Sequence, residues 1–465
     1  MKRHPAHLIR RILRPTRRLP SLLTAAVVAV TGIALFLPSH GVRAVPSNAG
    51  IVTDNGASGS AAVRLASTTT VSSGVILHYG DGGPSYYSKW PNGFSSSPSF
   101  FPIGVFPAEA TPASLTAMGI DFFTPMRNDV LGTFSPVWNA PKGDGMTNVD
   151  AQPGFYGGAS FYDTLDGKAW GSQAAFDVYG DEMDGNCNNW FANLPTSLTS
   201  LAQCGSWGGL TAASIEAIDA QSRALDPSRP TYIQTTVTMI DGDENYHYTS
   251  AQKNAICAST DIFSFDTYPL VKRNEPVWAM YDQVNEARRD CQFARPVFAF
   301  VEMDHMDNGN IYPQPAQTSA EVWNAIIAGA RGIQYFDQYA HITDSSYTGG
   351  GTYAPGAMYK AMTATDLEVQ SLAPVLNAQT ANGYVTKSIW GNLSTLTKYY
   401  NGNFYIFAIP HTSGSHSVTF HLAGASTGKV IVLNENRTIN VTHGYFSDTF
   451  ANENTVHIYE FVPAS

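Results

Sequence analysis

The chain has 465 residues, of which 43% are hydrophobic and 14% are charged, a globular composition that excludes a disordered chain and allows two or three domains. The first 44 residues hold eight of the 27 Lys and Arg residues and no acid, so the remainder has 19 basic and 37 acidic residues and a net charge near −18. Such a surface repels nucleic acid and anionic lipid head groups, and we therefore expect a neutral substrate.

The N-terminal segment, residues 1–44, has the pattern of a secretory signal peptide. Seven Lys and Arg residues lie within the first 18 positions, residues 22–37 form an apolar run of 16, and Val42-Arg43-Ala44 fits the small-x-small cleavage pattern. We expect cleavage after Ala44 and a secreted protein. The run is shorter than the about 20 residues that a membrane-spanning helix needs. An uncleaved anchor is the alternative, and paired arginines leave the twin-arginine export route open.

Residues 45–72 are rich in Ser, Ala, Thr and Gly, which is typical of a flexible linker. From about residue 100, runs rich in β-branched and aromatic residues alternate with stretches of helical periodicity. Eight strand-like runs are present, at 100–106, 120–126, 145–151, 176–182, 231–237, 261–270, 295–303 and 332–339. Eight β-α units within about 250 residues are typical of a (β/α)8 TIM barrel, which we place at residues 73–372.

Helices are expected in four of the intervening segments, 111–119, 211–226, 276–290 and 319–332. Thr111 before Pro112, and Ser319, are the predicted N-terminal caps.

Past about residue 375, only strand patterns follow, with apolar and polar residues in alternation. Asn401-Gly402-Asn403 lies where a hairpin turn is expected. These patterns predict a C-terminal all-β sandwich over residues 373–465. The predicted fold class is therefore α/β, with a barrel followed by a β-sandwich.

Two glutamates follow barrel strands at positions where active sites of this fold lie. Glu182 comes at the end of the fourth strand-like run and Glu302 at the end of the seventh. The C-terminal ends of all barrel strands meet at one rim, so these two side chains are expected near each other. Two carboxyl groups at one site suit the cleavage of a glycosidic bond, in which one protonates the leaving oxygen and the other attacks the anomeric carbon or activates water.

These glutamates, with "DTYP" after strand six and "DPSRP" before strand five, resemble the retaining (β/α)8 glycoside hydrolases of the large clan that includes many cellulases, mannanases and β-galactosidases. The resemblance covers roughly residues 96–465, and the trailing β domain is similar to the accessory sandwich common in that group. It implies that Glu182 is the acid/base, that Glu302 is the nucleophile, and that Tyr268 reaches toward Glu302 and tunes it. The clan usually has Asn before the acid/base residue, where it binds the sugar 2-hydroxyl. This chain has Asp181 there, which can still accept a hydrogen bond from a hydroxyl and whose charge raises the pKa of a neighbouring acid.

Further residues near the predicted rim are candidates for substrate contact. Asp266 either binds the substrate or holds a neighbouring loop. Trp190 and Trp207, in the long segment after strand four, stack on sugar rings or pack down as lids. Gln334 and Tyr335 in strand eight complete the set. Three other acids, Asp184, Asp304 and Asp307, are expected to be solvated loop residues.

The four cysteines suggest disulfides in an exported protein, and three pairings are open. We favour Cys187–Cys204, because both lie in the segment after strand four, and Cys257–Cys291, because they precede the adjacent strands six and seven. No Cys or His spacing fits a zinc site, and phosphate-loop and metalloprotease motifs are absent from the sequence. We therefore predict neither a metal nor a cofactor.

The leading hypothesis is a secreted glycoside hydrolase that acts on a neutral poly- or oligosaccharide by a two-carboxylate retaining mechanism. We expect a monomer with a carbohydrate substrate, without a nucleic-acid partner and without a membrane partner after signal cleavage. The alternative is a non-catalytic carbohydrate-binding or cell-surface protein that keeps the barrel as a scaffold, because fold does not establish activity.

Overall fold

The structure is a computed structural model. It describes residues 74–108, 112–125, 127–128, 133–134, 147–151, 174–178, 182–185, 200–225, 227–241, 247–306, 311–336, 343–388 and 393–464. The predicted signal peptide and linker, residues 1–72, and the predicted cap Thr111 lie outside these residues.

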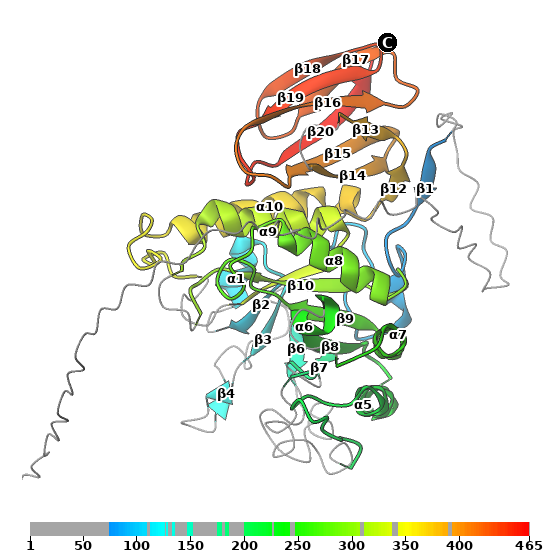
Figure 1. The fold of residues 1–465 in the computed structure, drawn as a ribbon, viewed down its shortest axis with the longest axis vertical. Helices are drawn as coiled ribbons and strands as arrows, with labels where there is room; N and C mark the ends of the chain where they lie inside the picture. The colour runs from blue at the N-terminus through cyan, green and yellow to red at the C-terminus, as the bar shows by residue number, and fades with distance from the viewer. Residues whose placement is uncertain are drawn as a thin grey trace, which may run out of the picture. The chain divides into compact units, whose positions relative to one another are not determined.

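Within the described part of the chain, eight parallel strands close into a barrel, which confirms the predicted fold (Figure 1). The strands are β2 (Ile103–Ala108), β3 (Phe122–Pro125), β6 (Thr147–Ala151), β7 (Ala174–Val178), β8 (Thr231–Thr236), β9 (Ile262–Asp266), β10 (Val297–Glu302) and β11 (Gly332–Phe336). Each lies within or overlaps one of the eight strand-like runs. A separate hairpin pairs β4 (Arg127–Asn128) with β5 (Thr133–Phe134).

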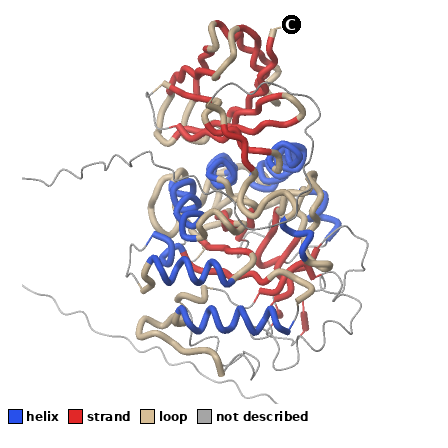
Figure 2. Tube along the Cα trace, turned by 90° about the vertical axis from the view of Figure 1, so that its right-hand side faces the viewer, coloured by secondary structure: helices blue, strands red, loops and turns tan. Residues whose placement is uncertain are grey.

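Helices lie around the strands (Figure 2). They are α1 (Pro112–Met118), α5 (Ala212–Leu225), α6 (Val237–Asp241), α7 (Ser250–Ser259), α8 (Ala279–Asp290), α9 (Pro315–Ala328) and α10 (Ala357–Leu376), with a short 3-10 helix η1 (Tyr86–Lys89) before the barrel. Helix α9 begins four residues before the expected position, because Gln314 caps it and Gln317 completes a capping box. The prediction of Ser319 as the cap was therefore wrong.

Aromatic side chains fill one part of the barrel interior. Phe94, Phe122 and Phe298 lie together there with Tyr232 and Ile262. The rings of Phe94 and Phe122 are 5.2 Å apart, and those of Phe94 and Phe298 are 6.1 Å apart. Successive side chains of a strand point to opposite faces, so the neighbours of Phe298 in β10 pack outward against the helices.

A disulfide joins Cys257 of α7 to Cys291, the C-cap of α8, with a Cα–Cα distance of 5.1 Å. This pairing confirms the second of the two predicted bonds. Cys204 is also disulfide-bonded. Its expected partner, Cys187, lies outside the described residues.

Strand β1 and the C-terminal strands form an antiparallel sheet of ten strands among the residues described, in the order β1-β12-β14-β15-β20-β17-β18-β19-β16-β13. They are β1 (Ile76–His78), β12 (Gln379–Asn382), β13 (Val385–Lys387), β14 (Leu393–Tyr400), β15 (Asn403–Pro410), β16 (His416–Leu422), β17 (Thr427–Val432), β18 (Arg437–Thr442), β19 (Tyr445–Phe450) and β20 (His457–Pro463). The sheet folds back on itself, so that Phe420 of β16 and Phe446 of β19 contact Tyr459 of β20 at 5.5 and 5.1 Å between ring centroids.

The predicted hairpin turn connects β14 to β15. Asn401 and Gly402 form its two-residue loop and both have positive φ, 50° and 89°. This is the geometry that Asn-Gly favours in hairpins, since both positions need a left-handed backbone.

The boundary between barrel and sheet differs in detail from the expected residue 372/373. Helix α10 runs to Leu376, and the sheet resumes at Gln379. Strand β1, which precedes the barrel in sequence, pairs with β12 of the C-terminal sheet. In the described residues, no helix is both long and apolar enough to span a membrane.

Candidate active site at the barrel rim

Acidic side chains follow three of the barrel strands at their C-terminal ends. Glu182 and Asp184 come after β7, Asp266 ends β9, and Glu302 ends β10. The strands run parallel, so these positions belong to the same rim of the barrel. Three residues nominated from the sequence, Glu182, Asp266 and Glu302, therefore share the end of the fold on which (β/α)8 active sites lie.

The segment that carries Glu182 is held by backbone hydrogen bonds from both sides. The Met183 amide donates to the Gln234 carbonyl of β8 at 3.3 Å, and the Leu210 amide donates to the Met183 carbonyl at 2.9 Å. Glu182 is half-buried and adopts a left-handed backbone with φ of 49°, which is uncommon for a residue other than Gly, Asn or Asp. Such strain is concentrated at functional sites, where the surrounding structure holds it.

Asp184 is buried and ties this segment to the end of β8. Its Oδ1 accepts from the Thr236 amide at 2.8 Å and its Oδ2 accepts from the Thr236 hydroxyl at 2.6 Å. Burial raises its pKa to about 6, although the bonds from Thr236 act in the opposite direction. The prediction of a solvated loop acid was wrong, because Thr236, 52 residues further along the chain, covers the carboxylate.

Glu302 is fully buried, and both of its oxygens accept backbone hydrogen bonds from the segment after β9. Oε1 accepts from the Leu270 amide at 2.7 Å and Oε2 from the Val271 amide at 3.0 Å. Its carboxyl group also lies within hydrogen-bonding range of Glu321 in α9. Burial raises the pKa of Glu302 to about 7, while these hydrogen bonds oppose the rise and the charge of Asp304 adds to it.

Asp304 is also fully buried, contrary to the expected solvated position. Its Oδ1 accepts from the Met306 amide at 2.7 Å. Tyr347 and Tyr353 lie near enough for the charge of Asp304 to contribute to their raised pKa values, for which burial is the main cause. Asp307 lies outside the described residues.

Tyr268 hydrogen-bonds a different acid from the one expected. Its hydroxyl donates to Oδ2 of Asp266 at 3.2 Å, so its phenolic proton is directed to Asp266 instead of Glu302. Its ring packs beside Phe336 of β11, with centroids 5.5 Å apart. The expectation that Tyr268 tunes Glu302 by a direct hydrogen bond is therefore corrected, since the donor is already engaged two residues back.

Gln334 and Tyr335 point to opposite faces of β11. Gln334 accepts from the Tyr232 hydroxyl at 3.0 Å within the barrel. The hydroxyl of Tyr335 donates to Oδ1 of Asp366 in α10 at 2.7 Å, and the side chain is fully buried. Tyr335 therefore stabilises the contact between β11 and α10 and does not reach the rim, which corrects the prediction of substrate contact.

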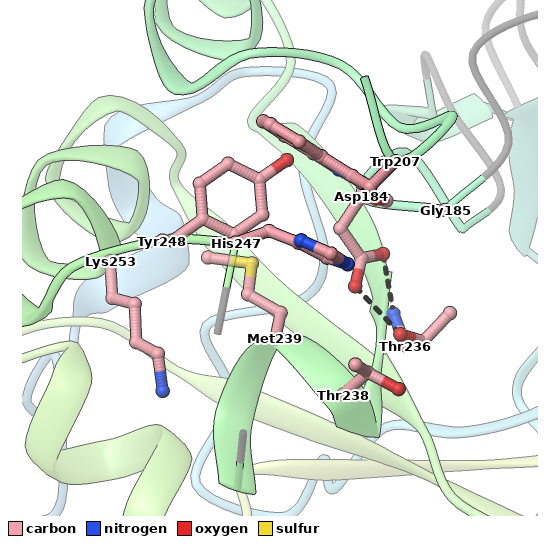
Figure 3. A pocket seen from close by; sticks show the side chains of 9 residues that line it. All are labelled: Asp184, Gly185, Trp207, Thr236, Thr238, Met239, His247, Tyr248 and Lys253. Carbon is pink, nitrogen blue, oxygen red and sulfur yellow. Dashed lines mark hydrogen bonds between the residues drawn. The ribbon is translucent and has the colours of Figure 1, made fainter. Parts of the chain in front are cut away.

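Trp207 lines a cavity of about 160 Å³ beside the segment after β7. Its indole stacks on the His247 ring at 4.7 Å, and its Nε1 donates to the Asp184 carbonyl at 3.0 Å. Figure 3 shows Asp184 and Thr236 on one side of this cavity and Lys253 on the other. Trp207 therefore lies next to Asp184, in the segment after β7.

Two residues nominated from the sequence, Asp181 and Trp190, lie outside the described residues. Sequence reasoning in turn missed Thr236 and Glu321. Glu321 had one detectable signal, because it is the single acid in the otherwise largely apolar helical stretch 320–330. Among the residues described, His, Cys, Asp and Glu side chains form no group of three or more that would hold a metal ion.

No family model matches the chain, and no curated protein matches its sequence. Solved structures give weak similarities. An α-amylase from Geobacillus thermoleovorans complexed with acarbose has 9% identity, covers 81% of this chain and 100% of its own, and has a TM-score of 0.47. A putative α-galactosidase from Bacteroides fragilis has 10% identity, coverages of 79% and 80%, and a TM-score of 0.46. A bifunctional glucanase-xylanase from a metagenome library has 10% identity, coverages of 84% and 97%, and a TM-score of 0.45. The (β/α)8 fold is assigned from the strand pairing of this chain and not from these similarities.

Proposed function

We propose that the chain is a glycoside hydrolase that cleaves O-glycosidic bonds of a neutral poly- or oligosaccharide. The observation that supports this most is the gathering of acids from the ends of β7, β9 and β10 at one rim of a closed parallel barrel. Burial of Asp184 and Glu302 raises the free energy of their ionised forms. Acids at a rim that destabilise the fold are better explained by chemistry than by stability.

Glu182 is proposed as the acid/base and Glu302 as the nucleophile of a retaining mechanism. Glu302 suits the nucleophile because two amide N–H groups hold both its oxygens, which orients the carboxylate and favours its ionised form. Glu182 is half-buried at the end of the loop after β7, where it remains accessible to a leaving oxygen. A retaining enzyme needs the two carboxyl groups about 5–5.5 Å apart.

The cavity lined by Trp207 is proposed to contribute to saccharide binding. An indole offers an apolar face to the C–H patches of a sugar ring, and Asp184 and Thr238 supply polar groups on the same wall. The net charge near −18 after residue 44 disfavours an anionic saccharide, so a neutral one is the better substrate.

Export through a signal peptide is proposed from the sequence pattern of residues 1–44. N-terminal sequencing of the protein from culture medium is expected to begin at Val45. Full-length chain in the membrane fraction would instead support an uncleaved anchor.

A second candidate function is non-catalytic carbohydrate binding. The observation that favours it is the complete burial of Glu302, whose two oxygens are already satisfied by backbone amides. In the hydrolase proposal, the groups that cover Glu302 move aside when the substrate binds. In the binding proposal, Glu302 only stabilises the segment after β9.

The two candidates are separated by activity measurements on purified chain lacking residues 1–44. Hydrolysis is assayed on a panel of aryl glycosides and neutral polysaccharides for the wild type, Glu182→Gln, Glu302→Gln and a control, Glu286→Gln, on the outer helix α8. Both rim variants are expected to lose about 1000-fold in turnover while the control keeps it. Saccharide binding without hydrolysis in the wild type would favour the second candidate.

The roles of the two glutamates are tested by adding azide to variants with a small side chain at each position. In a retaining enzyme, azide restores turnover of Glu302→Gly with inverted configuration of the glycosyl azide, and that of Glu182→Ala with retained configuration. Near-normal activity of Glu302→Gln would exclude Glu302 as the nucleophile.

A further inference from the structure

Glu321 in helix α9 is a second fully buried glutamate, and its carboxyl group lies within hydrogen-bonding range of Glu302. Neither oxygen of Glu321 accepts a well-formed hydrogen bond within the described residues, although the backbone amide of Glu302 lies near enough to lower its pKa. The carboxyl group of Glu302 is therefore the main polar partner of Glu321. Two carboxyl groups in contact and away from water cannot both be ionised, because their charges repel and neither can donate.

A proton on one of the two glutamates converts this repulsion into an O–H···O hydrogen bond. The donors around the pair decide which glutamate carries the proton. Glu302 accepts from the amides of Leu270 and Val271, which stabilise a carboxylate at that position. Glu321 has only the weaker contact with the Glu302 backbone amide, so it is the one that stays protonated and donates to Glu302.

The electrostatics of the pair agree with this distribution. Burial and the charge of Glu302 raise the pKa of Glu321 well above its ordinary value, whereas the amide bonds limit the rise at Glu302. Asp304, which follows Glu302 at the same strand end, adds negative charge and further opposes a second ionisation. The two protons of the pair are therefore lost in separate steps.

The polar side chains around Glu321 do not stabilise helix α9, so fold stability does not explain a buried glutamate at this position. Thr318 and Asn324 lie one turn before and one turn after it on the same face of α9 and are also fully buried. The Thr318 hydroxyl and the Asn324 carbonyl oxygen have no hydrogen-bond partner within the described structure. Apolar residues on this face would stabilise the helix packing more, since each unpaired buried polar group costs free energy.

We propose that Glu321 is a positioning residue that holds a proton against Glu302 and so keeps the Glu302 carboxylate ionised and oriented. With this bond, the carboxylate is fixed by three donors, two amides from the segment after β9 and one hydroxyl from α9. The role in catalysis rests on the proposed function of Glu302 as the nucleophile. The sharing of a proton between Glu321 and Glu302 does not depend on that function. The proton and the catalytic role are therefore tested separately.

The proton is tested by infrared spectroscopy of folded protein in D₂O at pH 7. The difference spectrum between wild type and Glu321→Gln is expected to show the loss of a carboxylic acid C=O band. Asp366→Asn is the matched control, because Asp366 is a fully buried acid of the neighbouring helix α10 whose partner is Tyr335. It removes its own acid band and leaves that of Glu321 in place. An unchanged carboxylic acid band in Glu321→Gln would overturn the proposal.

The positioning role is tested by the acidic limb of the pH profile of kcat/KM, which reports the protonation of the nucleophile. Glu321→Met removes the donor, and the limb is expected to move about one to two pH units upward, the effect of one lost hydrogen bond to a charged group. Glu321→Gln retains an N–H donor and is expected to keep the limb within about half a unit of the wild type. Asp366→Asn leaves it unchanged.

The outcomes separate the protonation of Glu321 from its role in catalysis. If Glu321→Met and Glu321→Gln lower kcat equally with no movement of the limb, Glu321 is only a packing residue and the positioning role is refuted. If the wild type hydrolyses no glycoside, the catalytic role falls with the proposed function. The infrared result then still decides whether Glu321 holds the proton.

Discussion

Replacement of Asp184 by Asn should make the chain more stable at alkaline pH while leaving it nearly unchanged in acid. The Asn carbonyl oxygen can accept from the Thr236 amide as Oδ1 does at 2.8 Å. The Thr236 hydroxyl, which donates to Oδ2 at 2.6 Å, can rotate and accept from the Asn amide group. Both links between the segment after β7 and the end of β8 are then kept, and only the ionisation is removed.

The magnitude follows from the pKa of Asp184, which burial raises to about 6 in the folded chain. An unfolded Asp titrates near about 3.9. A carboxyl group with a raised folded pKa contributes stability below the unfolded value, and this contribution is lost as pH rises through the folded value. Between pH 4 and pH 8 the wild type therefore loses about 2.5 kcal/mol of unfolding free energy that the Asn variant does not lose.

The measurement is urea denaturation of both proteins at pH 4, 6 and 8, compared as differences at each pH. Asp448→Asn is a control, because the contribution of Asp448 to stability has the opposite pH dependence. Burial of Asp448 is outweighed by its hydrogen bonds from Arg437 and others, so its pKa is lowered, and its contribution is lost as pH falls. Equal pH dependence of the wild type and Asp184→Asn would show that Asp184 is not desolvated as the structure indicates.

Three further predictions concern stability and the rim. Replacing Cys257 and Cys291 by Ala should lower the unfolding free energy by about 3.5 kcal/mol, as expected for two cysteines separated by 34 residues, and reducing agent should lower the melting temperature of the variant less than that of the wild type. Gly402→Ala should cost about 1 kcal/mol in chemical denaturation, because φ is 89° and open space surrounds the new methyl group, so that only the backbone conformation is penalised. A larger loss would mean that the hairpin register changes. Gly209→Ala should abolish most of the proposed hydrolytic activity with little change in far-UV circular dichroism, because its Cβ would collide with the Asp184 backbone carbonyl and displace the segment of Glu182. Unchanged kcat would show that this segment takes no part in the reaction.

Local patterns in the sequence were sufficient to predict the architecture of the barrel. All eight barrel strands lie at or beside the predicted runs, since a strand buried on both faces reads as a short run of β-branched and aromatic residues whatever its neighbours are. The Asn401-Gly402 turn was predictable for a similar reason, because only a few residue types accept its backbone angles. The Cys257–Cys291 bond followed from the adjacency of two consecutive barrel strands.

The candidate site was predictable only as a set of positions on a rim. The rim follows from strand direction, so Glu182 and Glu302 could be placed on it from their distance to the strand ends. Their partners could not be placed, because hydrogen bonds such as that from Val271 to Glu302 join segments about 30 residues apart. The helix start at Gln314 was missed because a glutamine capping box competes with a more common serine cap.

What the sequence by itself determined about this protein is the order and type of its elements and the end of the barrel at which acids collect. What only the tertiary structure decided is the environment of each acid and aromatic residue. Tyr335 points to α10 and Gln334 into the barrel, because neighbouring residues of a strand face opposite sides and the closure of the barrel sets which side is inside. Asp184 and Glu321 are buried because Thr236 of β8 and Glu302 of β10 are brought against them, and the ionisation of a carboxyl group depends on such distant neighbours far more than on the residues beside it in sequence.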